Sequence, residues 1–254
     1  MLPRDTIGAA IRAAPHGGPA LVAYVTAGFP SRGRFLADLS AVASAAEVVE
    51  IGVPFTDPMA DGTTIQRASH AALQQGVSLE WILEELSSLA TLPAPLLLMS
   101  YLNPLLAYGV SRLVAAARAA HVAGLIVPDL PDEESGELTV ALAPAGLALV
   151  PMVTPVTPPE RLNRIAAAAQ GFVYAVTMTG TTGREVAVPQ AVLDYLDRVR
   201  AAAHVPVCAG FGIRHREQVE RLRGHADGVV VGSALVEVLE RGEDPQAFLR
   251  SLRG

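Results

Sequence analysis

The feature of this chain that most limits its fold is a repeating unit: a short apolar run, a loop rich in glycine or proline, and a segment with helical periodicity. Each apolar run has the length and the β-branched content of a buried strand. The runs lie at residues 20–26, 46–52, 95–101, 123–128, 146–153, 171–177, 205–210 and 226–231. Strands that alternate with helices in this way predict an α/β fold with a parallel sheet.

The segments between the runs have the periodicity of amphipathic helices. They lie at roughly 31–45, 63–74, 78–90, 104–120, 132–143, 158–169, 189–203 and 215–224, and a further one begins near Ser233. Eight strand–helix units of even apolar content predict a closed (β/α)8 TIM barrel, a single domain over residues 1–254, and barrels of about 250 residues are common. An open doubly wound sheet is the alternative fold. It predicts a Gly-x-Gly-x-x-Gly turn after an early strand, and the sequence has none.

The residues before the first run predict a short extra N-terminal helix. Asp5 or Thr6 is the expected N-cap, and Ile7 and Ile11 fall on one apolar face. The helix is expected to end at Gly17-Gly18. Because an apolar face outside the repeat needs a surface to bury it, we expect this helix to plug the bottom of the barrel.

Composition supports one large core and excludes several functions. Hydrophobic residues are 51% of the chain and charged residues 17%, which is too apolar for a disordered protein. The net charge of -6 argues against nucleic acid or an anionic membrane as a partner. The single cysteine, Cys208, excludes an internal disulfide and fits a reducing cytoplasm.

Residues 86–111 carry no charged side chain and have the length of a membrane span. Pro93, Pro95 and Pro104 divide this stretch into pieces of strand and loop length. The first residues also lack the apolar core of a signal peptide. We therefore expect a cytoplasmic protein rather than an exported or membrane-spanning one.

The stretch 46–66 concentrates the residues best suited to chemistry. Glu50 lies inside the apolar run of a buried strand, where an unpaired charge costs several kcal/mol. Such a carboxylate is neutralised, paired with a cation, or kept with a shifted pKa for a function. The glycines and prolines that follow predict a structured loop, and this loop brings a second carboxylate, Asp61, near the first.

Polar residues also mark the ends of other predicted strands. In a TIM barrel the active site lies at the carboxyl ends of the strands. The polar residues at these ends are Tyr24, Thr26, Glu50, Tyr101, Asn103, Asp129, Tyr174 and Thr177. A tyrosine at a strand end often only caps the core, with its hydroxyl in water. We expect Tyr24 and Tyr101 to contact a ligand.

Glycines after the last strands predict a phosphate site. Strand seven runs into Gly210-Phe211-Gly212-Ile213, and strand eight runs into Gly232-Ser233-Ala234 at the opening of a helix. Backbone N–H groups at such glycines, with the helix N-terminus, bind anions, and this is the usual phosphate position in these barrels. Plain tight turns are the alternative. Gly180-Thr181-Thr182-Gly183 suits either a closing lid or a static loop.

Residues 50–62, Glu-Ile-Gly-Val-Pro-Phe-Thr-Asp-Pro-Met-Ala-Asp-Gly, resemble the signature of the tryptophan synthase alpha subunit family. Residues 23–30, Ala-Tyr-Val-Thr-Ala-Gly-Phe-Pro, and residues 124–131, Gly-Leu-Ile-Val-Pro-Asp-Leu-Pro, are similar to that family as well. The resemblance implies a lyase of tryptophan biosynthesis, which cleaves indole-3-glycerol phosphate to indole and glyceraldehyde 3-phosphate. The retro-aldol reaction implied uses no metal and no Schiff base, and the subunit has no cofactor of its own.

Matching positions assign roles by resemblance. Glu50 is the acid/base, and Asp61 is the partner of the indole N–H. The positions that match the substrate pocket or lid are Tyr24, Tyr101 and Thr182, and the phosphate-binding positions are Gly183, Gly212, Gly232 and Ser233. Tyr174, at the end of the sixth predicted strand, is also expected to bind the substrate. The chain departs from the family at Thr63, where proline is usual, and in the lid, where a serine and often an arginine are usual.

The resemblance also implies a partner, a pyridoxal-phosphate-dependent beta subunit, in a heterotetramer of two alpha and two beta chains. The loop of Pro54, Phe55, Asp57 and Met59 has the apolar anchors, the rigid prolines and the charge that such an interface needs. The alternative for Phe55 is that its ring folds back over the barrel. Two other functions remain open, another phosphosugar-handling barrel enzyme such as an isomerase, and a non-catalytic phosphate-sensing subunit; intact Glu50 and Asp61 oppose the second.

Overall fold

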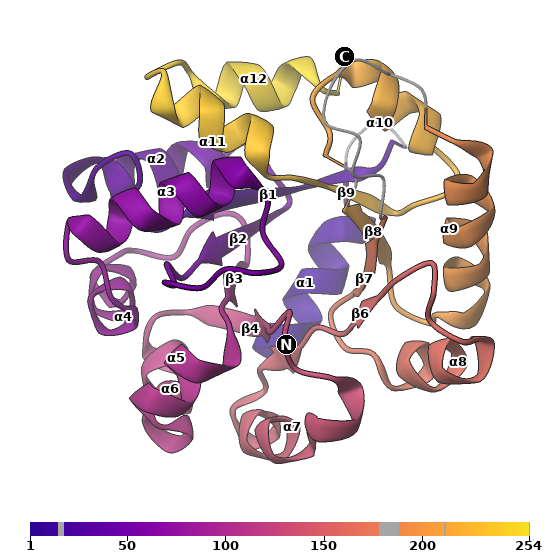
Figure 1. Ribbon diagram of the computed structural model, residues 1–254, viewed down its shortest axis with the longest axis horizontal. Helices are drawn as coiled ribbons and strands as arrows, with labels where there is room; N and C mark the ends of the chain where they lie inside the picture. The colour runs from indigo at the N-terminus through magenta and orange to yellow at the C-terminus, as the bar shows by residue number, and fades with distance from the viewer. Residues whose placement is uncertain (15–17, 178–187, 211, 254) are drawn as a thin grey trace.

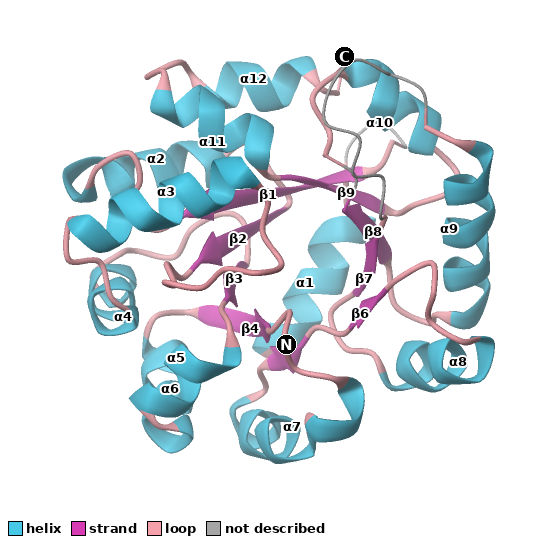
Figure 2. Ribbon diagram, in the orientation of Figure 1, coloured by secondary structure: helices cyan, strands magenta, loops and turns pink. Residues whose placement is uncertain are grey.

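The structure, a computed structural model, describes residues 1–14, 18–177, 188–210 and 212–253. All strands in this part of the chain belong to one parallel sheet in the order β5-β4-β3-β2-β1-β9-β8-β7-β6. They are β1 (Ala20–Thr26), β2 (Val48–Gly52), β3 (Leu96–Met99), β4 (Val122–Ile126), β5 (Ala148–Leu149), β6 (Met152–Val153), β7 (Val173–Val176), β8 (Val207–Gly210) and β9 (Gly228–Val231). Figure 2 shows these strands inside a ring of helices.

The two end strands of the sheet, β5 and β6, are halves of one extended run, and this closes the barrel. The N–H of Val150 donates to the carbonyl of Leu125, within β4, at 2.9 Å. The carbonyl of the following Pro151 accepts from the N–H of Tyr174 on β7, also at 2.9 Å. The predicted fifth strand is therefore split, because its first half pairs with β4 and its second half with β7. The (β/α)8 TIM barrel is confirmed.

The helices follow the predicted order with two differences. In the described residues they are α2 (Phe35–Ala43), α3 (Thr63–Gln74), α4 (Leu79–Ser87), α5 (Leu102–Tyr108), α6 (Val110–Ala119), α7 (Gly136–Leu142), α8 (Pro159–Ala168), α9 (Gln190–Ala202), α10 (Arg216–Leu222), α11 (Ser233–Glu240) and α12 (Pro245–Ser251), with short 3-10 turns at 32–34, 132–134 and 143–145. The segment expected as one helix over 104–120 is broken at Gly109, whose φ of 92° does not continue a helix. Helix α12 was not predicted; it is capped by the carboxylate of Asp244.

The extra N-terminal helix, α1 (Pro3–Arg12), closes the amino-terminal end of the barrel, as predicted (Figure 1). Ile7 and Ile11 are buried among interior side chains of the strands. The predicted boundaries were wrong: the N-cap is Leu2, and the helix ends at Arg12, before Gly17-Gly18. Asp5 lies inside the first turn, where its carboxylate accepts a hydrogen bond from the N–H of Leu2 at 3.2 Å, so it does act on the helix start.

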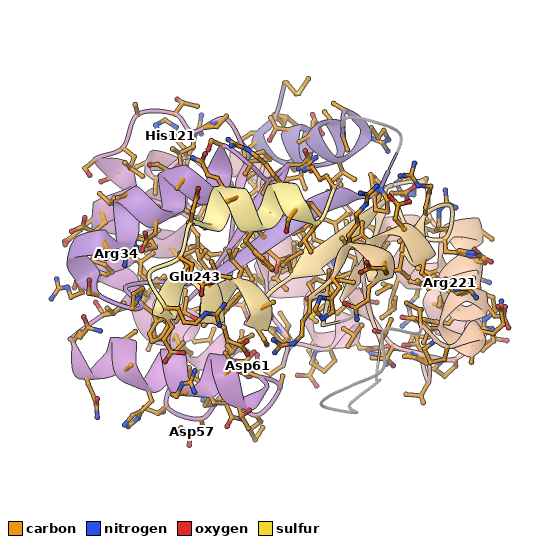
Figure 3. The ribbon with its side chains drawn as sticks, turned by 90° about the horizontal axis from the view of Figure 1, so that it is seen from above. Arg34, Asp57, Asp61, His121, Arg221 and Glu243 are labelled. Atoms are coloured by element: carbon orange, nitrogen blue, oxygen red, sulfur yellow. The ribbon has the colours of Figure 1, made fainter. Side chains whose placement is uncertain are left out.

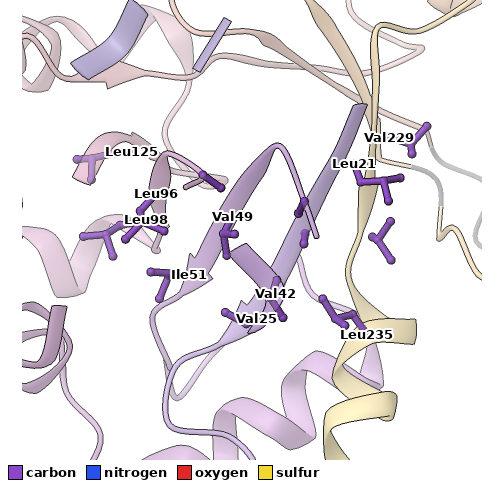
Figure 4. Packing of buried hydrophobic residues seen from close by; sticks show 14 of the residues in the cluster. Leu21, Val25, Val42, Val49, Ile51, Leu96, Leu98, Leu125, Val229 and Leu235 are labelled. Carbon is purple, nitrogen blue, oxygen red and sulfur yellow. The ribbon is translucent and has the colours of Figure 1, made fainter. Parts of the chain in front are cut away.

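Alternate residues of each strand serve two different cores. Val49 and Ile51 of β2 pack outward against the helices, in the cluster that also holds Leu98 and Leu235 (Figure 4). Val48 faces the barrel interior. Because successive side chains on a strand point to opposite faces, Glu50 faces the interior as well.

The uncharged stretch 86–111 is distributed over the end of α4, strand β3, helix α5 and the first turn of α6. Among the described residues, no helix has the length and apolar character needed to cross a membrane.

Candidate active site

Glu50 is a fully buried carboxyl group inside the barrel. Its exposed fraction is 0%, and neither oxygen has a hydrogen-bond partner among the described residues. The structural ion pair considered from the sequence is not present in that part of the chain. Burial raises the pKa of Glu50 to about 8, because a charged carboxylate loses its water there. Glu50 is therefore mostly protonated at neutral pH.

Tyr24 lies directly opposite Glu50 in the register of β1 and β2. Its hydroxyl accepts a hydrogen bond from Thr26 at 3.4 Å. A side chain at Gly52 would place Cβ 2.0 Å from that hydroxyl, so glycine is required there. Burial raises the pKa of Tyr24, and the charges of Asp61 and then Glu50 add to this. Tyr24 therefore lies within electrostatic reach of both carboxyl groups.

Asp61 occupies a different environment, in the loop after β2 at the carboxyl ends of the strands. Its Oδ2 accepts a hydrogen bond from the Tyr101 hydroxyl at 3.2 Å. Burial raises the pKa of Asp61, while this hydrogen bond opposes the shift. Figure 3 shows Asp57 and Asp61 on one side of the molecule and His121, just before β4, on the other. The loop lies at the end of the barrel opposite the α1 plug.

The loop that carries Asp61 is fixed to α3. The N–H of Phe55 donates to the Ser69 hydroxyl at 2.9 Å, and the Gln66 amide donates to the Asp61 carbonyl at 2.9 Å. The sequence analysis did not identify Ser69. Its signal is a polar side chain on the buried face of α3, between Ala68 and Ala72.

The predicted interface residues of this loop are not equally exposed. The Phe55 ring stacks on the Tyr101 ring, with centroids 5.1 Å apart and an angle of 28°. This is the folded-back position that the sequence left as the alternative for Phe55. Pro54 is buried, whereas Asp57 is exposed and Met59 is 85% exposed.

Thr63, where the family usually has proline, is the first residue of α3. The N–H at this helix position needs no intrahelical partner, so proline is favourable there but not required. The helix begins directly after Gly62.

A small cavity joins the predicted pocket residues. It is lined by Tyr24, Val53, Phe55, Asp61, Ser69, Met99, Ser100, Tyr101 and Pro128. Tyr174 is not part of this lining; it lies deeper, with its ring 6.1 Å from Phe172. Burial first, and then the charge of Glu50, raise the pKa of Tyr174, so this tyrosine lies within electrostatic reach of Glu50. Thr182 lies outside the described residues.

The predicted phosphate glycines border the same end of the barrel. Gly212 has a φ of 68°, which favours glycine, and there is open space where its side chain would be. Gly232 caps α11, and its carbonyl accepts from the N–H of Val236 at 3.1 Å. The N–H groups before Val236, including that of Ser233, have no partner within the helix and can meet an anion. Gly183 lies outside the described residues.

These features define a class: a parallel TIM barrel with two carboxyl groups in unlike environments and a glycine-flanked helix N-terminus at the carboxyl ends of its strands. Comparison with known proteins identifies the family. The sequence profile of the tryptophan synthase alpha chain matches residues 12–252. The alpha chain of Nitratidesulfovibrio vulgaris strain DP4 is 44% identical over 237 residues, 92% of each chain. That of Carboxydothermus hydrogenoformans is 43% identical over 227 residues, 89% of this chain and 85% of its relative.

Solved structures agree. Tryptophan synthase from M. tuberculosis, in an open form with BRD0059 bound, superposes with a TM-score of 0.87 at 33% identity, covering 97% of this chain and 96% of that chain. The alpha subunit from Legionella pneumophila str. Paris has a TM-score of 0.87 at 30% identity, covering 100% and 97%. The chain belongs to the tryptophan synthase alpha chain family. Its activity is the family's lyase reaction in tryptophan biosynthesis, cleavage of indole-3-glycerol phosphate.

Proposed function

We propose that Glu50 and Asp61 have separate roles in this cleavage, Glu50 in proton transfer and Asp61 at the indole nitrogen. The observation that supports this proposal is the difference between the environments of the two carboxyl groups. Breaking the carbon–carbon bond requires a proton on the indole ring carbon, removal of a proton from the glycerol hydroxyl, and stabilisation of charge at the ring nitrogen. Two carboxyl groups whose surroundings shift their pKa values differently can take separate roles.

Glu50 is suited to the proton transfers. With a pKa raised to about 8 it is protonated at neutral pH and can donate to the ring carbon. The carboxylate left behind then accepts the hydroxyl proton as the bond breaks, so Glu50 returns to its neutral form. The two products are indole and glyceraldehyde 3-phosphate. The apolar interior around Glu50 favours the neutral form at the start and the end of the cycle.

Asp61 is suited to the ring nitrogen. It is less buried than Glu50, and the hydrogen bond from Tyr101 favours its ionised form. A carboxylate that accepts a hydrogen bond from the indole N–H stabilises positive charge at the nitrogen while the ring carbon is protonated. Tyr24 lines the same cavity, and Tyr174 packs among the interior side chains of the barrel that Glu50 also faces, so both are proposed to contact the substrate.

The phosphate group is proposed to bind at Gly212, Gly232 and Ser233, where α11 presents its N-terminal N–H groups. Thr182 and Gly183, which match lid and phosphate positions by resemblance, are proposed to complete the site. The glycine segment after β8 and the opening of α11 come from neighbouring strands of the sheet. This spacing suits one anion that is bound from both sides.

The partner is proposed to be a tryptophan synthase beta subunit, docked over the loop of Pro54, Phe55, Asp57 and Met59. Pyridoxal phosphate is assigned to that partner only, and two alpha and two beta chains form the complex in the cytoplasm. The loop joins Glu50 to Asp61, so docking and catalysis are expected to be coupled. Met59 is exposed and is proposed to contact the beta subunit directly. Phe55 acts indirectly, through its stacking contact with the Tyr101 ring.

The decisive experiment measures indole release from indole-3-glycerol phosphate by the purified chain. Glu50→Gln keeps the shape of the side chain but cannot transfer the proton, so the rate falls by about 10²–10⁴ while substrate still binds. Asp61→Asn is also expected to be strongly impaired. Glu80→Gln, at an exposed glutamate of α4, serves as the control. Cleavage by Glu50→Gln within a few-fold of the parent would refute the assignment.

A further inference from the structure

One carboxylate, that of Glu237 on α11, connects three segments that border the site. The guanidinium of Arg214 contacts it with both terminal nitrogens, Nη1 to Oε2 at 2.7 Å and Nη2 to Oε1 at 2.8 Å. The hydroxyl of Thr64 donates to Oε1 at 3.3 Å. Figure 1 shows α3 and α11 side by side, with Thr64 in the first and Glu237 in the second.

Each member of this group stands close in sequence to a residue assigned to the substrate. Glu237 follows Ser233 by one helical turn, so the two share a face of α11. Arg214 follows Gly212 by two residues, and Thr64 follows Asp61 by three. The ion pair thus links both halves of the proposed phosphate site to the helix that fixes the Asp61 loop.

The segment from Gly212 to Arg214, called the Gly212 segment below, depends on contacts made by Arg214. Glycine has no side chain to hold it, and its positive φ is one of many conformations open to it. The backbone N–H of Arg214 donates to the amide oxygen of buried Gln218 at 2.8 Å. The Arg214 side chain then anchors the same residue to α11. The backbone contact ties Arg214 to α10 and the side-chain contact ties it to α11, so the residue two positions after Gly212 is held from both sides.

Stability alone does not account for the pair. The side chains of Arg214 and Glu237 are 47% and 26% exposed, and ion pairs this exposed add little to the free energy of folding. The planar two-point contact instead fixes geometry, which a lysine in place of Arg214 would not reproduce.

We propose that Glu237, through Arg214, is a positioning residue for substrate phosphate, which sets the spacing between the Gly212 segment and the N-terminus of α11. The inference rests on the phosphate site proposed above. It predicts that the pair acts on binding of the phosphate group and not on the proton transfers at Glu50. A purely electrostatic role of Glu237 predicts the opposite result for Glu237→Gln. Removal of a negative charge near the site would strengthen phosphate binding.

The test compares Glu237→Gln with Glu240→Gln. Glu240 pairs with Arg67 at 2.5 Å and joins the same two helices, α11 and α3, further from the site and without the Gly212 segment. Glu237→Gln is expected to raise KM for indole-3-glycerol phosphate, and the Kd for inorganic phosphate measured by calorimetry, by about three- to tenfold. Its kcat and the pH profile of kcat should stay unchanged. Arg214→Lys should show the same direction, and Glu240→Gln should match the parent.

Three outcomes would overturn the inference. Tighter phosphate binding by Glu237→Gln would show an electrostatic role only. An equal effect of Glu237→Gln and Glu240→Gln would show general helix packing. An unchanged KM would remove the role altogether. Ser233→Asp separates this from failure of the phosphate site itself, because a carboxylate at the N-terminus of α11 repels a bound anion. If Ser233→Asp weakens phosphate binding while Glu237→Gln does not, only the positioning role fails, and if neither does, the site is misplaced.

Discussion

The hydroxyl of Tyr101 donates a hydrogen bond to the carboxylate of Asp61 and accepts one from the N–H of Ala60, at 3.2 and 2.8 Å. The two residues come from different strand ends, since Asp61 lies in the loop after β2 and Tyr101 follows β3. A single tyrosine therefore fixes the position of the loop and opposes the effect of burial, which raises the pKa of Asp61. The ring of Tyr101 also stacks on the ring of Phe55.

Tyr101→Phe is expected to move the acid limb of the pH–rate profile to higher pH. The hydrogen bond from Tyr101 lowers the pKa of Asp61, so its loss raises that pKa and reduces the ionised fraction on the acid side. Phenylalanine keeps the ring contact with Phe55. The profile of kcat/KM measures the shift, and Tyr108→Phe on α5 is the control, because that ring packs against Arg112 instead. An acid limb that does not move would contradict a role for Asp61 in its ionised form.

Glu50 is expected to make the folded protein less stable as pH rises. Between about pH 4.5 and 8 the unfolded chain ionises Glu50 while the folded chain keeps it protonated, so the folded state holds more protons and loses stability with pH. Glu50→Gln does not titrate. The difference between the free energy of unfolding of Glu50→Gln and that of the parent should therefore shift in favour of the variant, by about a few kcal/mol, as the pH rises from 5 to 8.

Urea unfolding at several pH values measures this difference. Glu80→Gln, at an exposed carboxylate, should show no comparable trend. A constant difference between the parent and Glu50→Gln would mean that Glu50 is ionised in the folded state across this range, and it would remove Glu50 as the proton donor.

Gly52→Ala is expected to disturb Tyr24 and lower both stability and cleavage. Its Cβ would stand 2.0 Å from the Tyr24 hydroxyl, so the ring must leave its place opposite Glu50. Overpacking of this kind costs about 1–3 kcal/mol. Gly136→Ala is the matched control, because no atom lies within 4 Å of the added methyl at the start of α7. The prediction is checked by measuring the Tm and kcat/KM of both variants. Equal values for Gly52→Ala and Gly136→Ala would show that Tyr24 has room to move.

The alternation of apolar runs and helices was sufficient to predict the barrel, because the same unit recurs eight times and each run is bounded by glycine or proline. Local details depended on tertiary contacts that periodicity does not contain. The fifth run reads as one strand, yet Val150 and Pro151 bond to opposite neighbours where the ring closes. Helix α12 follows a short segment after α11, and its start is marked only locally, by the Asp244 cap and by Pro245 at the first helical position.

The candidate site shows the same division. Glu50 was identifiable because a carboxyl group in an apolar strand is unusual in any fold. Ser69 and Glu237 were not, because a serine in one helix and a glutamate in another gain meaning only from partners distant in the chain, Phe55 and Arg214. Resemblance to a family does not help where the contact comes from a pair of side chains outside its motifs.

The last prediction concerns the beta subunit, and it depends on the contrast within one loop. Phe55 is stacked on Tyr101, which leaves Met59 as the exposed large apolar side chain of the segment 53–62. Exposed apolar residues on a rigid loop are typical anchors of an interface. Because this loop joins Glu50 to Asp61, a partner that grips Met59 also acts on the distance between the two carboxyl groups.

Met59→Asp is expected to weaken binding of the cognate beta subunit about tenfold or more and to reduce the acceleration of indole production in the mixture, with little effect on the isolated chain. Phe55→Ala should lower the rate of the isolated chain as well, because it removes the ring that supports Tyr101.

Val140→Asp on α7 is the control: Val140 is 73% exposed, against 85% for Met59, but lies outside the loop. Calorimetric titration with the beta subunit and an indole assay measure both effects. If Met59→Asp binds and responds as Val140→Asp does, the loop is not the docking surface; if the parent chain itself neither binds the beta subunit nor changes its rate, the chain is a free-standing lyase that releases indole.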